Sequence, residues 1–184
     1  MKFTPLNDWC WGYDGEQLKI IMKADNGTSY TFNTHFRMAD LLNPPKDGQA
    51  FCIEDAALLT DYREGLEKLN LSEGGCLDLG INAVACARFV RPSVPSGRYF
   101  IPFGGREYFK RGSIVSVYTK EGNIGDCIVL AESDADNLVR LMLLNRTLKV
   151  GDGRVFLLGN MLRTKMDMLC RFRAFSAYRS AHYA

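Results

Sequence analysis

Two prolines near the middle of the chain, Pro92 and Pro95, constrain its fold more than any other local feature. Proline disfavours the α conformation in the residue before it, so a helix that approaches Pro92 is expected to end there. The patterns before the prolines include helices, whereas those after them are typical of short strands. The sequence therefore predicts an α+β protein of two small domains, residues 1–92 and residues 93–184.

The first domain is predicted to be an α/β domain with antiparallel strands. The stretch WCWGYD alternates, which places Trp9, Trp11 and Tyr13 on one face of a strand. Two further strands are joined by Asn26-Gly27, a strong hairpin signal because both residues tolerate positive φ. Large aromatic residues on strands usually pack inside, so Trp9 and Trp11 are expected in the core, as is Phe51.

Two helices are predicted after these strands. Between Glu54 and Asn70 apolar residues recur at near-helical spacing, with acidic residues at the beginning and Lys68 near the end. Ser72 is then expected to cap a second helix, whose apolar stripe runs to Phe89. The helix would end at the prolines, so the domain boundary is expected between residues 88 and 100.

The second domain is predicted to be rich in β-structure and to resemble a small barrel. Turn sequences separate its short β-favourable runs, which are RYFIPF, SIVSVYT, DCIVLAE, NLVRLMLLN and GRVFLLG. Several short strands at such spacing are typical of a barrel or a sandwich. The last stretch, residues 161–184, is compatible with a strand followed by a helix or a tail.

Charge is distributed unevenly between the two halves. Residues 1–90 contain 8 Lys and Arg against 13 Asp and Glu, a net charge of −5. Residues 91–184 contain 15 Lys and Arg against 8 Asp and Glu, a net charge of +7. The basic half is therefore expected to attract an anionic partner.

Several classes of protein are disfavoured by what the sequence lacks. No run of eighteen apolar residues is present and the N-terminus does not resemble a signal peptide, so we expect a cytoplasmic protein without membrane contact. The six cysteines include no C-x-x-C pair, and we expect them to be reduced and mostly buried. The two histidines, His35 and His182, belong to no metal-binding pattern, so no metal is expected.

No catalytic or cofactor-binding motif is recognisable either. The acidic cluster ESDADN fails the calcium-loop pattern and is expected to be a polar turn. The glycine-rich stretches lack phosphate-loop spacing and are expected to be hairpin turns. Glu54 and Asp55 would serve as an acid–base pair only in principle, because acids at a helix start also complement the helix dipole. We therefore expect neither an enzyme nor a cofactor.

Basic and aromatic residues are mixed in the second half, as in RFVRPSVPSGRYF and CRFRAFSAYR. Such mixtures occur in proteins that bind single-stranded nucleic acid. The RNP pattern and a helix-turn-helix are both absent, and the chain is not strongly basic overall. A nucleic-acid-binding module is therefore the alternative rather than the leading hypothesis.

Several motifs occur together in the order of one family, and the chain resembles the bacterial cell-division proteins of the ZapC family. The resemblance covers residues 1–95 well, and beyond them it rests mainly on ESD and LLGN. The motifs that carry it in the first half are DWCWGYD, FCIEDAALL, LNLS and NAVACARFVRP with the second proline of PSVP.

The resemblance implies an α/β N-terminal domain with a pocket that could receive a peptide or small ligand, and a β-barrel-like C-terminal domain. It also implies binding to polymers of FtsZ, the tubulin-like GTPase of the division ring, at mid-cell. Members of the family promote lateral association of FtsZ protofilaments and damp GTP turnover, and they are not enzymes. We expect the protein to act as a monomer.

A basic surface would bind FtsZ, which is an acidic protein. Arg91, before the first proline, matches a basic position of the family. The lysine that follows the second proline in the family is replaced by Ser96, with Arg98 two residues later. Further basic candidates map loosely onto the C-terminal half, namely Arg163, Lys165 and Arg171.

Overall fold

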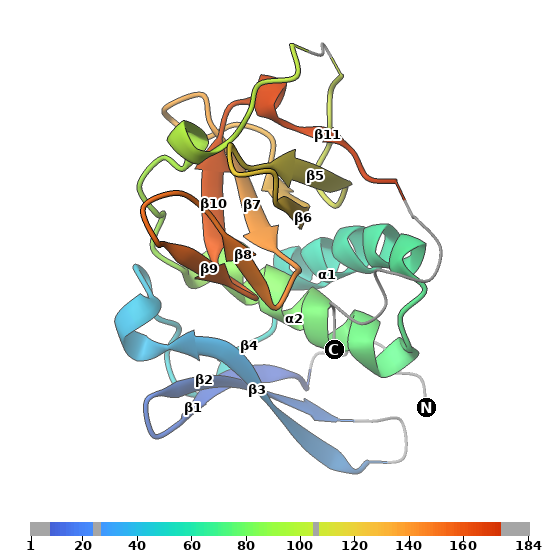
Figure 1. Ribbon diagram of the computed structural model, residues 1–184. Helices are drawn as coiled ribbons and strands as arrows, with labels where there is room; N and C mark the ends of the chain where they lie inside the picture. Colours follow the sequence, from blue (N-terminus) through green and yellow to red (C-terminus); the bar gives the residue numbers. More distant parts are fainter. Residues whose placement is uncertain (1–7, 24–26, 105–106, 174–184) are drawn as a thin grey trace.

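The computed structural model describes residues 8–23, 27–104 and 107–173 (Figure 1). Its N-terminal part contains a four-stranded antiparallel sheet of order β3-β2-β1-β4. The strands of this sheet are β1 (Cys10–Asp14), β2 (Gln17–Lys23), β3 (Ser29–Arg37) and β4 (Gln49–Ala50). The predicted hairpin is confirmed, because β2 and β3 pair up to Lys23 and Ser29. Gly27 has the positive φ that its turn was expected to need, whereas Asn26 lies outside the described residues.

Two helices follow this sheet, α1 (Ile53–Leu66) and α2 (Glu73–Phe89). Ser72 caps α2 as predicted, since its hydroxyl accepts a hydrogen bond from Gly75 N at 3.1 Å. After Phe89 the backbone becomes extended at Val90, two residues before Pro92. The prolines thus follow the helix end where the sequence predicted it.

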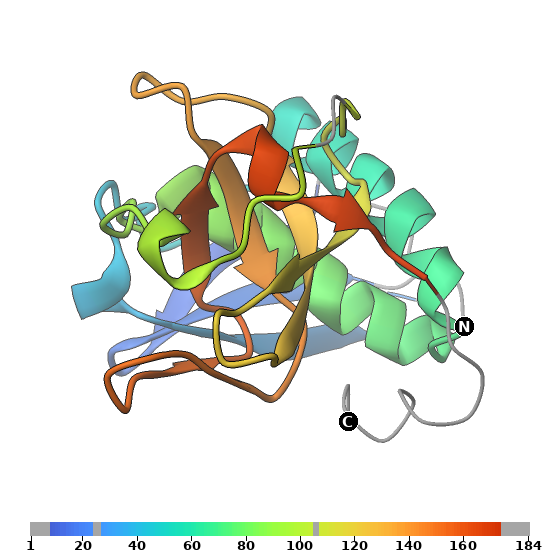
Figure 2. The same ribbon diagram turned by 45° about the horizontal axis from the view of Figure 1, so that its top comes forward.

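Beyond the prolines the chain forms β-structure (Figure 2). An open five-stranded antiparallel sheet has the order β10-β7-β6-β5-β11, so β10 and β11 are its opposite edges. Its strands are β5 (Ile114–Tyr118), β6 (Ile124–Ala131), β7 (Val139–Leu143), β10 (Met161–Thr164) and β11 (Cys170–Arg171). A hairpin of β8 (Thr147–Lys149) and β9 (Val155–Leu157) lies apart from this sheet.

The α+β class is confirmed, but two details differ from the prediction. The sheets do not close into a true barrel, because β10 and β11 do not pair with each other. The run RYFIPF is not a strand: Gly97–Tyr99 form a short 3-10 helix, and only Phe100 makes an isolated bridge, to Thr119. Tyr99 and Phe100 are nevertheless buried, so their apolar character serves packing rather than strand pairing.

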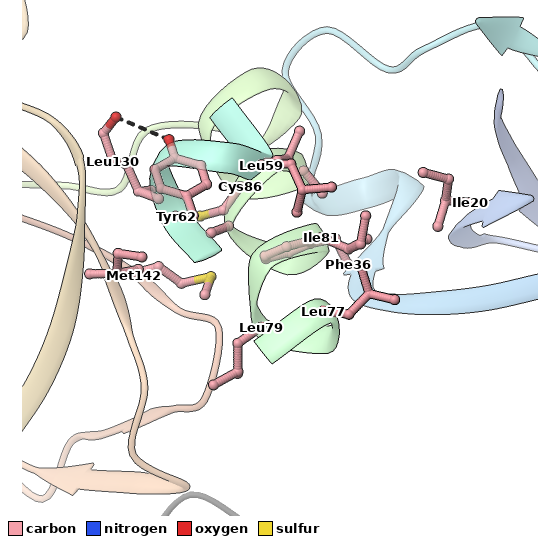
Figure 3. Packing of buried hydrophobic residues seen from close by; sticks show 14 of the residues in the cluster. Ile20, Phe36, Leu59, Tyr62, Leu77, Leu79, Ile81, Cys86, Leu130 and Met142 are labelled. Atoms are coloured by element: carbon pink, nitrogen blue, oxygen red, sulfur yellow. Dashed lines mark hydrogen bonds between the residues drawn. The ribbon is translucent and has the colours of Figure 1, made fainter. Parts of the chain in front are cut away.

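The two helices lie between the two large sheets (Figure 1). One hydrophobic cluster combines residues from the N-terminal sheet, both helices and the C-terminal sheet (Figure 3). Ile20 and Phe36 belong to the first sheet, whereas Leu130 and Met142 belong to the second. The hydroxyl of Tyr62 on α1 also donates a hydrogen bond of 3.2 Å to the Leu130 carbonyl. The two predicted domains therefore share a hydrophobic core.

A second cluster lies on the other face of the C-terminal sheet, and β6 shows why both faces are apolar. Ile128 and Leu130 belong to the first cluster, whereas Cys127 and Val129 belong to the second. Alternate residues of a strand point to opposite faces, so a strand covered on both sides is a continuous apolar run. Burial also raises the pKa of the Cys127 thiol, which makes it an unreactive core residue.

Three of the four motifs of the first half that carry the family resemblance meet at one carboxylate. Asp55, which is 0% exposed, accepts hydrogen bonds from the Trp11 indole at 3.0 Å and from Cys52 N at 3.2 Å. Its second oxygen lies 3.0 Å from Nε of Arg88, near the end of α2. Asp55 therefore connects β1, the start of α1 and the end of α2. Trp9, Trp11 and Phe51 are buried as expected, and the Phe51 ring contacts those of both Trp9 and Trp11.

Candidate partner-binding surface

Arg91 and Arg98 are held by the segment that leaves α2 and runs beside β10. Ser96 N donates a hydrogen bond of 2.7 Å to the Arg163 carbonyl, and Gly97 packs against Thr164. The backbone of Arg91 donates a hydrogen bond of 2.9 Å to the Asp40 carbonyl. Their side chains are exposed, so the segment fixes two cations at the surface.

The structure adds a third cation, Arg154, which the sequence did not indicate. The Arg98 guanidinium lies 4.7 Å from the centre of the Tyr99 ring, and the Arg154 guanidinium lies 5.8 Å from that of Phe156. Both arginines donate hydrogen bonds to the Tyr99 hydroxyl. The two rings meet edge to face, with centroids 6.1 Å apart.

Arg91 lies beside this cluster, since Arg91 and Phe156 both line a groove of about 350 Å³. We refer to Arg91, Arg98, Tyr99, Arg154 and Phe156 as the arginine–aromatic surface. Within the described part of the chain, none of its three arginines forms an ion pair with a carboxylate. Uncompensated guanidinium groups beside aromatic rings are suited to carboxylates of a protein partner.

The sequence did not indicate Arg154, because GDGRVFLLG is typical of a hairpin turn and of nothing more. That interpretation is correct for the backbone, as Asp152 and Gly153 have positive φ between β8 and β9. The contact that places Arg154 on this surface is its hydrogen bond to Tyr99, which is 55 residues away in the sequence. No local pattern contains such a contact.

Arg163 has a different environment from the three arginines above. Its side chain is only 11% exposed and forms ion pairs with Asp134, at 2.7 Å, and with Asp136. It also donates a hydrogen bond of 3.0 Å to the Ser93 carbonyl. These contacts connect the segment after α2 to β10 and to the acidic cluster ESDADN. That cluster is a polar turn, as predicted, because Asp134 also accepts hydrogen bonds from Asp136 N and Leu138 N.

We expect Arg163→Ala to lower the free energy of unfolding by about 2 kcal/mol, because it leaves the buried part of an ion-pair network without its cation. Burial favours the neutral form of Asp134, but hydrogen bonds from Arg163 and backbone N–H groups outweigh this and lower its pKa. The stabilisation is therefore present at neutral pH and lost as pH falls through that lowered pKa. Urea unfolding at pH 7 measures the change; an unchanged midpoint would contradict a structural role for Arg163.

The remaining predicted residues, Lys165 and Arg171, are both exposed. Lys165 follows β10 directly, on the same edge of the sheet as Arg163. Arg171 lies on β11 at the opposite edge, where it forms an ion pair with Glu107 at 2.9 Å. The structure thus separates Arg163 and Arg171, although only eight positions separate them in the sequence.

No helix among the described residues has both the length and the apolar character needed to cross a membrane. Within residues 8–23, 27–104 and 107–173, no three His, Cys, Asp or Glu side chains gather as a metal site would require. His182 lies outside the described residues. His35 contributes its backbone N–H, which donates a hydrogen bond of 2.7 Å to the Asn82 side chain.

The fold is that of an α+β protein, and among its described residues the three arginines of the arginine–aromatic surface form no ion pair with a carboxylate. The family described as "Cell-division protein ZapC, N-terminal" matches residues 2–91. A cell division protein ZapC of Musicola paradisiaca is 30% identical over 171 residues, which cover 92% of this chain and 90% of that protein. The ZapC proteins of Xenorhabdus bovienii and Pseudoalteromonas atlantica are 24% and 25% identical, over 83% and 90% of this chain and 82% and 91% of their own. The chain belongs to the ZapC family of cell-division proteins.

Proposed function

We propose that this protein binds FtsZ polymers at mid-cell through the arginine–aromatic surface and promotes lateral association of protofilaments. The observation that carries the proposal is the group of three arginines around Tyr99 and Phe156, which have no carboxylate partner in the part of the chain that the structure describes. Membership of the ZapC family supports the cell-division context. FtsZ is acidic, so these cations would steer its approach and pair with its carboxylates.

Lateral association requires that one molecule contact two protofilaments or change one filament so that others associate with it. In this proposal the protein is a monomer, and Arg171 belongs to a second contact at the β11 edge. A groove there is lined by Arg171 and Arg173 together with Phe103. The Phe103 ring packs on that of Tyr118, with ring centroids 5.0 Å apart. Filaments present many sites, so two modest contacts would be strengthened by avidity. The association would damp GTP turnover by FtsZ, and the protein itself would carry out no reaction.

Co-sedimentation with GTP-assembled FtsZ tests the first contact. The double variant Arg98→Glu/Arg154→Glu is expected to bind about tenfold more weakly, since it replaces two attractive charges by repulsive ones. A matched control is Lys23→Glu/Lys46→Glu, because both lysines are exposed near the N-terminal sheet and the charge change is identical. Arg91→Glu asks separately whether the neighbouring groove takes part.

The measurement is made over a salt series with nuclease-treated proteins, so that contaminating nucleic acid does not mediate binding. Wild type and control should pellet together with FtsZ and should lose binding as salt is raised. If both double variants lose FtsZ binding equally, only the total charge of the protein matters. The arginine–aromatic surface would then not be the binding site. If the wild type does not pellet at low salt, the FtsZ proposal is wrong.

A further inference from the structure

A third groove, of about 620 Å³, lies beside α1 at the C-terminal end of β6. We refer to it as the Arg140 groove. Its apolar wall comes from α1, α2 and β6, through Leu58, Ala87 and Leu130. Its charged lining residues are Asp61, Lys110, Arg111, Glu132 and Arg140. It shares no lining residue with the groove beside Arg91.

Arg140 is the unusual member of this lining. It pairs with Arg163 across β7 and β10, so the two side chains lie on the same face of the sheet. The Nε atom of Arg140 is buried and has no hydrogen-bond acceptor. In the described part of the chain its side chain also forms no ion pair, whereas Arg163 has two. An unsatisfied buried donor of a charged group is costly, and native structures rarely keep one without a reason.

The carboxylates of the groove are already engaged by other residues. Asp61 forms an ion pair of 2.6 Å with Arg111. Glu132 accepts a hydrogen bond of 3.2 Å from Arg111 N and another from the Tyr108 hydroxyl. The hydrogen bond from Tyr108 also lowers the pKa of Glu132, so this carboxylate stays ionised and engaged. Among the described residues, Arg140 and the exposed Lys110 therefore remain as the cations of this groove that form no ion pair.

We infer that the Arg140 groove binds a peptide segment of a protein partner in which an acidic residue stands next to an apolar one. The carboxylate would accept hydrogen bonds from Arg140 and be attracted by Lys110, which removes the unsatisfied donor. The neighbouring apolar side chain would pack on Leu58, Ala87 and Leu130. A groove of this size, with an apolar wall beside its charged groups, fits a peptide segment better than a free anion. The inference does not depend on FtsZ or on the arginine–aromatic surface.

The test uses fluorescently labelled, N-acetylated tetrapeptides in which Asp or Glu is flanked by Leu, Ile or Phe. A matched set carries Asn or Gln instead, and fluorescence anisotropy measures binding to the full chain. At least one acidic peptide is expected to bind saturably and about tenfold more tightly than its amide counterpart, as a charge-assisted pair would require. Equal binding of the two sets, or no saturable binding in either, would overturn the inference.

Two variants place the binding at the groove. Arg140→Met keeps an unbranched side chain but removes the guanidinium, so peptide affinity should fall about tenfold. Arg146→Met is the matched control, because Arg146 is exposed and lies outside the lining of the groove. The control should bind as the wild type does; equal loss in both variants would show nonspecific attraction and overturn the inference.

Thermal unfolding separates a binding role from a structural one. Arg140→Met should keep or raise the melting temperature, because it removes an unsatisfied buried donor. If the melting temperature falls instead, Lys110→Gln provides a second test, because Lys110 is exposed and its substitution should not affect folding. Lys110→Gln should weaken peptide binding several-fold. An unchanged peptide affinity would overturn the inference. Competition by sodium acetate or phosphate at the peptide's own concentration range would show a free-anion site and would also overturn it.

Discussion

The substitution Gly65→Ala is expected to lower the free energy of unfolding by roughly 3 kcal/mol, because it forces apart two segments whose backbones touch. Gly65 lies on the buried side of α1, and a Cβ there would overlap the carbonyl oxygen of Gly112 and lie 3.0 Å from its carbonyl carbon. Backbone atoms cannot move aside as a flexible side chain does. Gly112 is itself restricted by a φ of +81°. The loop before β5 and the helix would therefore have to separate.

Gly74→Ala is the matched control, because Gly74 is in the first turn of α2 and an added Cβ would meet no atom within 4 Å. It should be neutral or slightly stabilising, since alanine favours a helix over glycine. Urea unfolding with two probes, Trp fluorescence and far-ultraviolet circular dichroism, measures both changes. For Gly65→Ala we expect the two probes to report one coincident transition at a lower urea concentration, because the two sheets share a hydrophobic core. No loss of stability would mean that the two segments are not held in contact.

Asp55→Ala is expected to cost about 4 kcal/mol, because it removes a buried acceptor with several donors directed at it. The indole of Trp11 and the backbone N–H of Cys52 would lose their acceptor, and Arg88 would lose its counter-ion. Few replacements satisfy all three groups. Asp55→Asn should cost less, because its carbonyl oxygen can still accept from one donor although the ion pair is lost.

The neighbouring acid provides the control for Asp55. Glu54→Ala removes an exposed carboxylate from the same first turn, so we expect almost no change in the free energy of unfolding. Thermal and urea unfolding at pH 7 compare the three variants. Similar small effects of Glu54→Ala and Asp55→Ala would contradict the anchoring role of Asp55 and leave only an interaction with the helix dipole.

The contacts of Asp55 give a physical reason why three of the family motifs occur together in this chain. Trp11 comes from DWCWGYD, Asp55 from FCIEDAALL and Arg88 from NAVACARFVRP. These stretches are distant in the sequence, yet the structure brings one residue from each to a single buried site. The resemblance in the first half thus rests on residues that hold β1, α1 and α2 together. It says less about a partner, because only Arg91 of the proposed arginine–aromatic surface belongs to one of these motifs.

Much of the local structure could be predicted from the sequence, because neighbouring residues determine it. Four predicted features depend only on backbone geometry within a few residues. They are the alternation in WCWGYD, the glycine turn after Asn26, the Ser72 cap and the helix end before Pro92. The burial of Trp9 and Trp11 follows from their size and from their alternating positions, Trp11 on β1 and Trp9 directly before it. The barrel-like expectation was less accurate, because sheet closure depends on which distant strands meet at the edges.

The candidate surface shows the same division between local and long-range information. The sequence by itself determined that the second half is basic and that Arg91 and Arg98 lie near the prolines at the end of the predicted helix. Only the tertiary structure decided that Arg154 joins them, that Arg163 is enclosed by two aspartates, and that Arg171 lies at the opposite edge of the sheet. The availability of a charged side chain depends on its neighbours in space, and strand order brings those neighbours from distant parts of the chain.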